Sequence, residues 1–336
     1  MKKFLPCVLI ICLLLTGCNK TMNKHDEIKD VDFAWNLIGL VSTQGNCYIT
    51  GDVSDKKNYG LDKIPSKWFQ SDDYLCIYDH GDAEKISLSP KGGTIVNNMN
   101  EVYVFLNGSQ NYRVPTVLLK GYIQAYLMDN DHVYLLSKSG DLGYSSIDNP
   151  SDFRLIGTNV KKFIVTVKEV NTKHSVFALT NDNRLYIFYD DEVITDTTDC
   201  LEGIIDFDLL VPHTRMCVLS LIDQESKSYM RFGDIPLTFD SFKDMNEYIK
   251  CCDNTIAVAS YCNGTATLDS DGNVRIYGSE IESDYNKTFE YYGDILFSNA
   301  KGIYGGYFNL IVSFADGHFE CFGRNYNKDQ YISFKR

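Results

Sequence analysis

The chain has 336 residues, of which 44% are hydrophobic and 13% aromatic, and its formal net charge at pH 7 is −13. This length and hydrophobic fraction are sufficient to bury a full core. The acidic balance disfavours binding to phosphate backbones and anionic lipid headgroups, so we expect no nucleic-acid partner.

The first segment of the chain has the pattern of an export signal. Lys2 and Lys3 precede an apolar run that ends at Leu15, too short for the ~20 residues of a transmembrane helix. The run leads into Leu-Thr-Gly-Cys18, which resembles the lipobox of bacterial lipoproteins. That resemblance implies cleavage before Cys18 and acylation of its thiol and amine. The alternative is an ordinary signal peptide, but the small residues before Cys18 and the polar pair after it favour the lipoprotein.

These features predict the organisation and the cellular address. We expect a signal peptide over residues 1–17, a lipidated tether over 18–30 and one domain over 31–336. The mature protein then lies on the extracytoplasmic face of a bacterial cell membrane, held by the lipid on Cys18 alone. Eight of the eleven cysteines remain after this processing. Cys47, Cys217 and Cys321 lie in apolar strand patterns, which favours free buried thiols, although the redox compartment leaves disulfides open.

The remainder of the chain consists of short β-type runs punctuated by Gly, Asn and Asp. One helix-like segment interrupts them, from Ser241 to Cys252, with Asp240 or Ser241 as its cap. The runs pair as seven hairpins, with tips near Gly45, Asn100, Asp131, Asp182, Gln224, Gly272 and Gly317. Their mean spacing of about 45 residues is the length of one four-stranded blade. The predicted fold is an all-β, seven-bladed β-propeller.

Several hairpins share one phrase. It is clearest in His-Ser-Val-Phe-Ala-Leu-Thr-Asn-Asp-Asn-Arg-Leu-Tyr-Ile-Phe at 174–188, and it recurs at 265–278 and 309–325. The phrase resembles the repeat of the regulator of chromosome condensation family, with Phe, Tyr or Ile in place of its tryptophan. The resemblance implies a seven-bladed β-propeller that serves mainly as a platform for binding proteins.

No stretch of the sequence carries a recognisable catalytic motif. Asp269-Ser-Asp-Gly-Asn273 is rich in oxygen ligands, but its glycine is in the wrong place for an EF-hand and the stretch coincides with a predicted hairpin tip. The six histidines show no metal-ligand spacing. We therefore expect no catalytic residues, no metal and no cofactor.

The predicted binding surface comes from the loops that follow the third strand of each repeat. These loops leave the same rim and are rich in aromatic residues, which anchor interfaces well. The residues that we expect to contribute are Tyr59, Trp68, Tyr144, Tyr285 and Tyr326. The alternative is that these rings pack between blades.

The predicted function is therefore binding by a monomer. The leading interpretation is recognition of a protein partner without catalysis. The second is a cell-surface propeller that binds or cleaves a glycan, using the aromatic loops as sugar platforms and a pair of carboxylates as catalyst.

Overall fold

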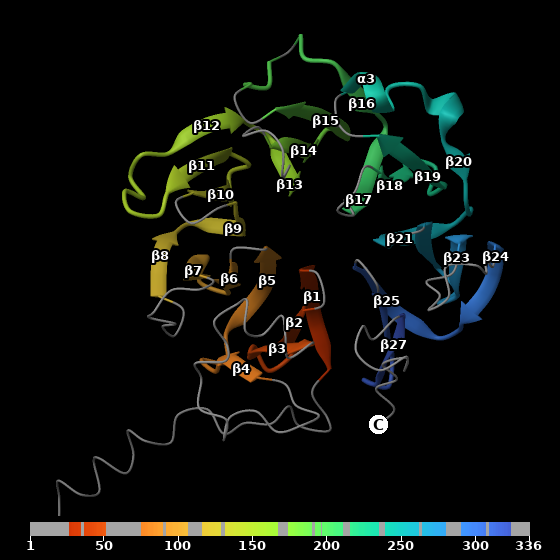
Figure 1. The fold of residues 1–336 in the computed structure, drawn as a ribbon, viewed down its shortest axis with the longest axis horizontal. Coiled ribbons are helices and arrows are strands. Elements are labelled where there is room, and N and C mark those ends of the chain that lie inside the picture. Colours follow the sequence, from red (N-terminus) through yellow and green to blue (C-terminus); the bar gives the residue numbers. More distant parts are fainter. Residues whose placement is uncertain are drawn as a thin grey trace, which may run out of the picture.

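The computed structural model contains seven β-sheets arranged in a ring, which confirms the seven-bladed β-propeller (Figure 1). It describes residues 27–34, 37–51, 75–89, 92–106, 116–128, 132–166, 174–189, 192–195, 197–210, 216–234, 239–261, 264–279, 290–306 and 309–323. Each sheet is one blade, and its strands follow one another along the chain in antiparallel order. The first strand of each blade lies nearest the axis of the ring.

The first three blades are built as follows. Blade one contains β1 (Ile28–Ala34), β2 (Leu37–Ser42), β3 (Cys47–Gly51) and β4 (Leu75–Tyr78). Blade two contains β5 (Ala83–Ser89), β6 (Gly92–Asn97), β7 (Glu101–Leu106) and β8 (Thr116–Lys120). Blade three contains β9 (Tyr122–Leu127), β10 (His132–Ser137), β11 (Leu142–Ser146) and β12 (Arg154–Gly157). The first strand thus begins three residues before the domain boundary expected at residue 31.

Blades four to seven continue the pattern. Blade four contains β13 (Val160–Thr166), β14 (Ser175–Thr180), β15 (Arg184–Tyr189) and β16 (Cys200–Glu202). Blade five contains β17 (Ile204–Leu210), β18 (Met216–Asp223), β19 (Ser228–Asp234) and β20 (Ile249–Lys250). Blade six contains β21 (Thr255–Tyr261), β22 (Gly264–Asp269), β23 (Val274–Ser279) and β24 (Glu290–Phe297). The described part of blade seven contains β25 (Ala300–Gly305), β26 (Asn309–Phe314) and β27 (Phe319–Gly323).

The turn between the second and third strands is the same in every blade and also joins the blades to one another. One turn residue adopts a left-handed conformation with positive φ, which Gly and Asn tolerate best. These residues are Gly45, Asn100, Gly140, Asn183, Ser226, Gly272 and Gly317. In the first six blades the carbonyl of this residue accepts a backbone N–H from the start of the next blade's inner strand, as Gly45 does from Ala83 at 3.0 Å. The repeated hairpin phrase therefore also fixes the spacing between neighbouring blades.

The third hairpin tip was wrongly placed by the sequence. The strands β10 and β11 turn around Gly140, whereas Asp131 falls between β9 and β10. The error arose because Asp-Asn-Asp at 129–131 has the composition of a hairpin turn. Such residues suit a connection between the first and second strands as well as one between the second and third strands. With Gly140 as the tip, the steps from Asn100 and to Asp182 are 40 and 42 residues, which removes the shortest spacing.

The expected helix over 241–252 is also wrong. The segment contains a four-residue helix α3 (Phe239–Phe242), a 3₁₀ turn η3 (Met245–Glu247) and the outer strand β20. The Asp244 side chain accepts the N–H of Asn246 and starts the second turn. Only Phe242 and Tyr248 of this segment are buried, six residues apart, which is not a helical spacing.

The core lies between the blades. All six residues of β14 are buried, and Leu179 is fully buried as the sequence predicted. Such strands are covered by neighbouring sheets on both faces, so polar and apolar residues do not alternate along them. The ring closes where β1 contacts β25, and Lys301 pairs with Glu27 at 3.3 Å across this seam. No helix among the described residues is long and apolar enough to span a membrane.

Candidate functional site

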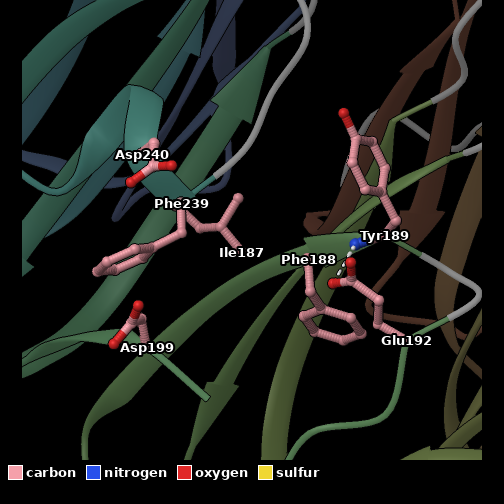
Figure 2. A pocket seen from close by; sticks show the side chains of 7 residues that line it. All are labelled: Ile187, Phe188, Tyr189, Glu192, Asp199, Phe239 and Asp240. Atoms are coloured by element: carbon pink, nitrogen blue, oxygen red, sulfur yellow. Dashed lines mark hydrogen bonds between the residues drawn. The ribbon is translucent and has the colours of Figure 1, made fainter.

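A pocket lies at the junction of blades four and five, on the face where the third strands end. Its volume is about 200 Å³. This face is opposite the hairpin tips, because each third strand begins at a tip and runs away from it. The lining residues are Ile187, Phe188, Tyr189, Glu192, Asp199, Phe239 and Asp240 (Figure 2). The pocket therefore occurs on the face that the sequence assigned to binding.

The blade-four side of the pocket comes from the end of β15. Ile187 and Phe188 are almost completely buried. Ile187 packs in the core between blades four and five, whereas the Phe188 side chain points to the other face of the sheet, into the core between blades three and four. Glu192 follows in the connection to β16, where its N–H donates to the Tyr189 carbonyl at 3.0 Å. Its carboxylate in turn accepts the Tyr189 N–H at 3.2 Å. This reciprocal pair holds the Glu192 carboxylate at the rim of the pocket.

The blade-five side comes from α3, which supplies Phe239 and Asp240. Arg231 on β19 holds the segment that follows α3. Its guanidinium donates to the Asp244 carbonyl at 3.3 Å, pairs with Glu247, and lies 5.7 Å from the ring centre of Phe242. Phe242 makes an edge contact with Phe177 of blade four, with ring centres 5.8 Å apart. This wall is consequently fixed to both blades.

The pocket is acidic. Glu192, Asp199 and Asp240 line it, and none of the described lining residues is Lys, Arg or His. Lys243 lies outside the lining and pairs with Asp240 at 2.7 Å. The hydrogen bond and charge of Asp240, with a smaller contribution from Asp199, raise the pKa of Lys243. Two of the three carboxylates, Glu192 and Asp199, have no ion-pair partner within the described part of the chain.

Of the residues predicted to bind, only Tyr144 lies within the described residues. It is on β11 rather than in the loop that follows, and it is half-buried. Its hydroxyl accepts a hydrogen bond from Arg154 at 2.7 Å, and its ring centre is 5.7 Å from that of Tyr134. Tyr144 thus contributes to the packing of blade three. Tyr59, Trp68, Tyr285, Tyr326 and the lipidation residue Cys18 fall outside the described residues.

The sequence analysis missed the residues that line the pocket. The signal available was the acidic stretch Tyr-Asp-Asp-Glu at 189–192, directly after an apolar third strand. Phe239 and Asp240 complete the same pocket only because blade five packs against blade four.

A second group of carboxylates lies on the inner strands, around the axis of the ring. Asp30 and Asp32 on β1 accept the N–H groups of Ile86 and Leu88 on β5, at 2.9 and 2.5 Å. Asp208 on β17 similarly accepts the N–H of Ser260 on β21 at 2.6 Å. Each carboxylate satisfies an edge N–H of the following blade, which would otherwise lack a partner. We interpret them as structural links between blades.

Burial of these carboxylates has an electrostatic cost. Desolvation raises the pKa of Asp30 to about 6 and that of Asp32 to about 7, although the hydrogen bonds from the next blade lower both. Desolvation also raises the pKa of Asp208. The charges of Asp30 and Asp208 further raise the pKa of Asp32, because like charges nearby disfavour its ionised form.

The oxygen-rich stretch at 269–273 forms a hairpin turn. The Asp269 carboxylate accepts the N–H groups of Asp271 and Asn273, at 3.0 and 2.9 Å, which is the usual role of Asp in a turn. Within the described ranges, no group of three or more His, Cys, Asp or Glu residues has the geometry to hold a metal ion. Among the described side chains, Cys47, Cys200, Cys251 and Cys252 are free thiols.

Comparison with known proteins gives structural neighbours only. No protein-family model matches the chain, and no curated protein matches it. The crystal structure of human WBSCR16 is similar with a TM-score of 0.58 and 13% identity, over 86% of this chain and 87% of that one. Prp20p from Saccharomyces cerevisiae, whose binding to Gsp1p and histones has been described, is similar with a TM-score of 0.55 and 12% identity, over 82% and 80% of the chains.

A bacterial surface protein is among the neighbours. PorZ, a component of the type-IX secretion system of Porphyromonas gingivalis, has a TM-score of 0.51 and 11% identity, over 90% of this chain and 38% of that one. At these identities the comparisons show the fold alone. They support a seven-bladed β-propeller and transfer no activity.

Proposed function

We propose that this protein is a lipid-anchored, extracytoplasmic platform that recognises a protein partner and has no catalytic activity of its own. The observation that carries the proposal is the pocket between blades four and five. Its two walls are fixed by Arg231 and by the Glu192–Tyr189 hydrogen bonds, so the site is preorganised on a rigid scaffold. Preorganisation favours binding because little conformational entropy is lost when a partner docks.

The repeat pattern supports the same proposal. The phrase at 174–188 spans β14, its turn and β15, the position that the regulator of chromosome condensation repeat predicts. We propose that the blades are repeats of that kind. Prp20p, with a similar fold, binds the proteins Gsp1p and histones, which is consistent with a protein-binding use of this architecture.

The cellular address rests on the N-terminal sequence. Lys2, Lys3 and the apolar run before Cys18 support export, and the lipobox-like residues support acylation. A monomer anchored by the lipid on Cys18 through residues 19–26 would hold the propeller at the extracytoplasmic surface of the membrane. Repulsion would keep its acidic surface away from anionic headgroups.

Site-specific photo-crosslinking in the native membrane tests the proposal. A photoreactive amino acid replaces Val193, which is 50% exposed beside the pocket, or Met99, which is 61% exposed at a hairpin tip on the opposite face. We expect a discrete protein adduct from position 193 and none from position 99. Equal adducts from both positions, or none from either, would contradict recognition through the pocket face.

A glycan-binding or glycan-cleaving propeller is the second candidate function. The pocket favours this glycan function because aromatic rings adjoin carboxylates there, the combination that glycosidases use. A glycan array, followed by assays for release of reducing sugar from any glycan bound, tests this function. Loss of sugar release in both Glu192→Gln and Asp199→Asn, with binding retained, would establish catalysis and overturn the leading proposal.

A further inference from the structure

We propose that the pocket between blades four and five binds a cationic side chain, an arginine or lysine, presented by the protein partner. The inference rests on the proposed function, because it names the chemistry by which the platform recognises its partner. It follows from the charge, the shape and the aromatic lining of the pocket.

The described lining of the pocket carries an excess of negative charge. Three carboxylates line it, and Lys243, a described cation nearby, is engaged with Asp240 at 2.7 Å. Glu192 and Asp199 lie on different sides of the pocket, as Figure 2 shows. Glu192 uses one carboxylate oxygen to accept the Tyr189 N–H, and among the described residues the other oxygen makes no hydrogen bond.

The aromatic lining suits a cation that must lose part of its water shell. Tyr189 lies on the blade-four side, and Phe239 lies between Asp199 and Asp240 on the other side (Figure 2). The Phe188 ring packs instead in the core between blades three and four. The faces of aromatic rings carry partial negative charge and attract Arg and Lys. An Arg side chain also forms paired hydrogen bonds with carboxylates, so we expect it to bind more tightly than Lys.

The size of the pocket selects a side chain rather than a larger element. The pocket volume of about 200 Å³ suits one long side chain and is too small for a helix or a folded loop. An anion such as a phosphate is repelled by the carboxylates, and a neutral sugar leaves them uncompensated.

The test uses the purified propeller and small probes. N-acetyl-arginine N-methylamide is titrated and binding is followed by NMR chemical-shift changes, alongside the neutral, nearly isosteric citrulline derivative. We expect the arginine probe to bind at least tenfold more tightly than the citrulline probe, and its affinity to fall several-fold at high salt. Binding of the two probes within twofold of each other would overturn the proposal.

Charge-neutralising variants locate the site. The double variant Glu192→Gln and Asp199→Asn should lower affinity for the arginine probe about tenfold, and both residues are exposed, so the fold should tolerate the changes. The matched control is Asp271→Asn with Glu225→Gln, two exposed carboxylates at hairpin tips on the opposite face. The control should change affinity less than twofold. Equal losses in both double variants would show that the acidic surface as a whole attracts the probe, and the pocket assignment would be wrong.

The outcome separates this inference from the function on which it rests. An adduct from position 193 without binding of the arginine probe would leave protein recognition in place and overturn the cationic ligand. Binding of the probe at the pocket without any protein adduct would support the cationic ligand and contradict the proposed partner class.

Discussion

Asp32 provides a sharp test of how the blades are joined. Its carboxylate lies on the inner strand of blade one and accepts the Leu88 N–H of blade two at 2.5 Å. Asparagine has nearly the same shape and keeps an oxygen that can accept this hydrogen bond. Asp32→Asn therefore removes the charge while it preserves the link between the blades.

The magnitude follows from the raised pKa. Folding moves the pKa of Asp32 from 3.8 to about 7, which corresponds to about 4 kcal/mol of unfavourable free energy for the charged form. Because the folded state holds this proton more tightly than the unfolded state, stability falls as pH rises through the window from about 4 to about 7. Between pH 5 and pH 8, Asp32 alone should lower the free energy of unfolding by about 2–3 kcal/mol.

Denaturant unfolding of the wild type and of Asp32→Asn, measured from pH 5 to pH 8, checks this reasoning. The variant should be more stable at pH 8, and its advantage at pH 8 should exceed that at pH 5 by about 2–3 kcal/mol. Asp271→Asn, an exposed aspartate at a hairpin tip, is the control and should follow the wild type. If Asp32→Asn kept the wild-type pH dependence, or lost stability at pH 8, the buried-charge account of the inner strands would be refuted.

Four further substitutions test the core, the pocket wall, the aromatic prediction and the anchor. Leu179→Ala removes a fully buried side chain and should cost about 2–5 kcal/mol in denaturant unfolding; a cost below 1 kcal/mol would argue against the sandwiched strand. Arg231→Ala removes the contacts that hold the segment after α3 and should cost about 1–3 kcal/mol, with faster amide exchange over 239–248; unchanged exchange there would show that Arg231 does not hold this wall. Tyr144→Ala should lower the melting temperature, because the ring packs on Tyr134; unchanged stability with lost partner capture would instead support the prediction that Tyr144 is a binding residue. Cys18→Ala should release the protein or leave an unprocessed precursor in membrane fractionation, whereas normal processing and membrane partition would contradict the lipobox.

The face of the candidate site was predictable from the sequence, but its residues were not. The third-strand loops must emerge on one rim, because strand order and antiparallel pairing repeat in every blade. Which loops approach one another is decided by neighbouring blades. Phe239 follows β19 of blade five and Ile187 lies near the end of β15 of blade four, about fifty residues earlier in the sequence, and no local pattern links them.

Features that depend on local interactions could be predicted from the sequence. Apolar runs fixed the strands, and Asp, Asn and Gly marked the turns, because turn conformation is set within four or five residues. That was enough for the all-β class, the seven blades and six of the seven tips. It failed at Asp131, where a turn-forming composition belongs to another connection, and at 241–252, where a polar segment with two buried rings was taken for a helix.

The way in which one blade meets the next became clear from the folded structure. The Gly45 carbonyl binds the N–H of Ala83, Asp32 binds that of Leu88, and Arg231 fixes one wall of the pocket. The partners of the first two contacts are 38 and 56 residues apart in the sequence, which is about the length of a blade. Such contacts depend on the angle and spacing between packed sheets. The buried charges around the axis and the acidic pocket on the loop face arise from that packing, since neither group of side chains is brought together until the ring is assembled.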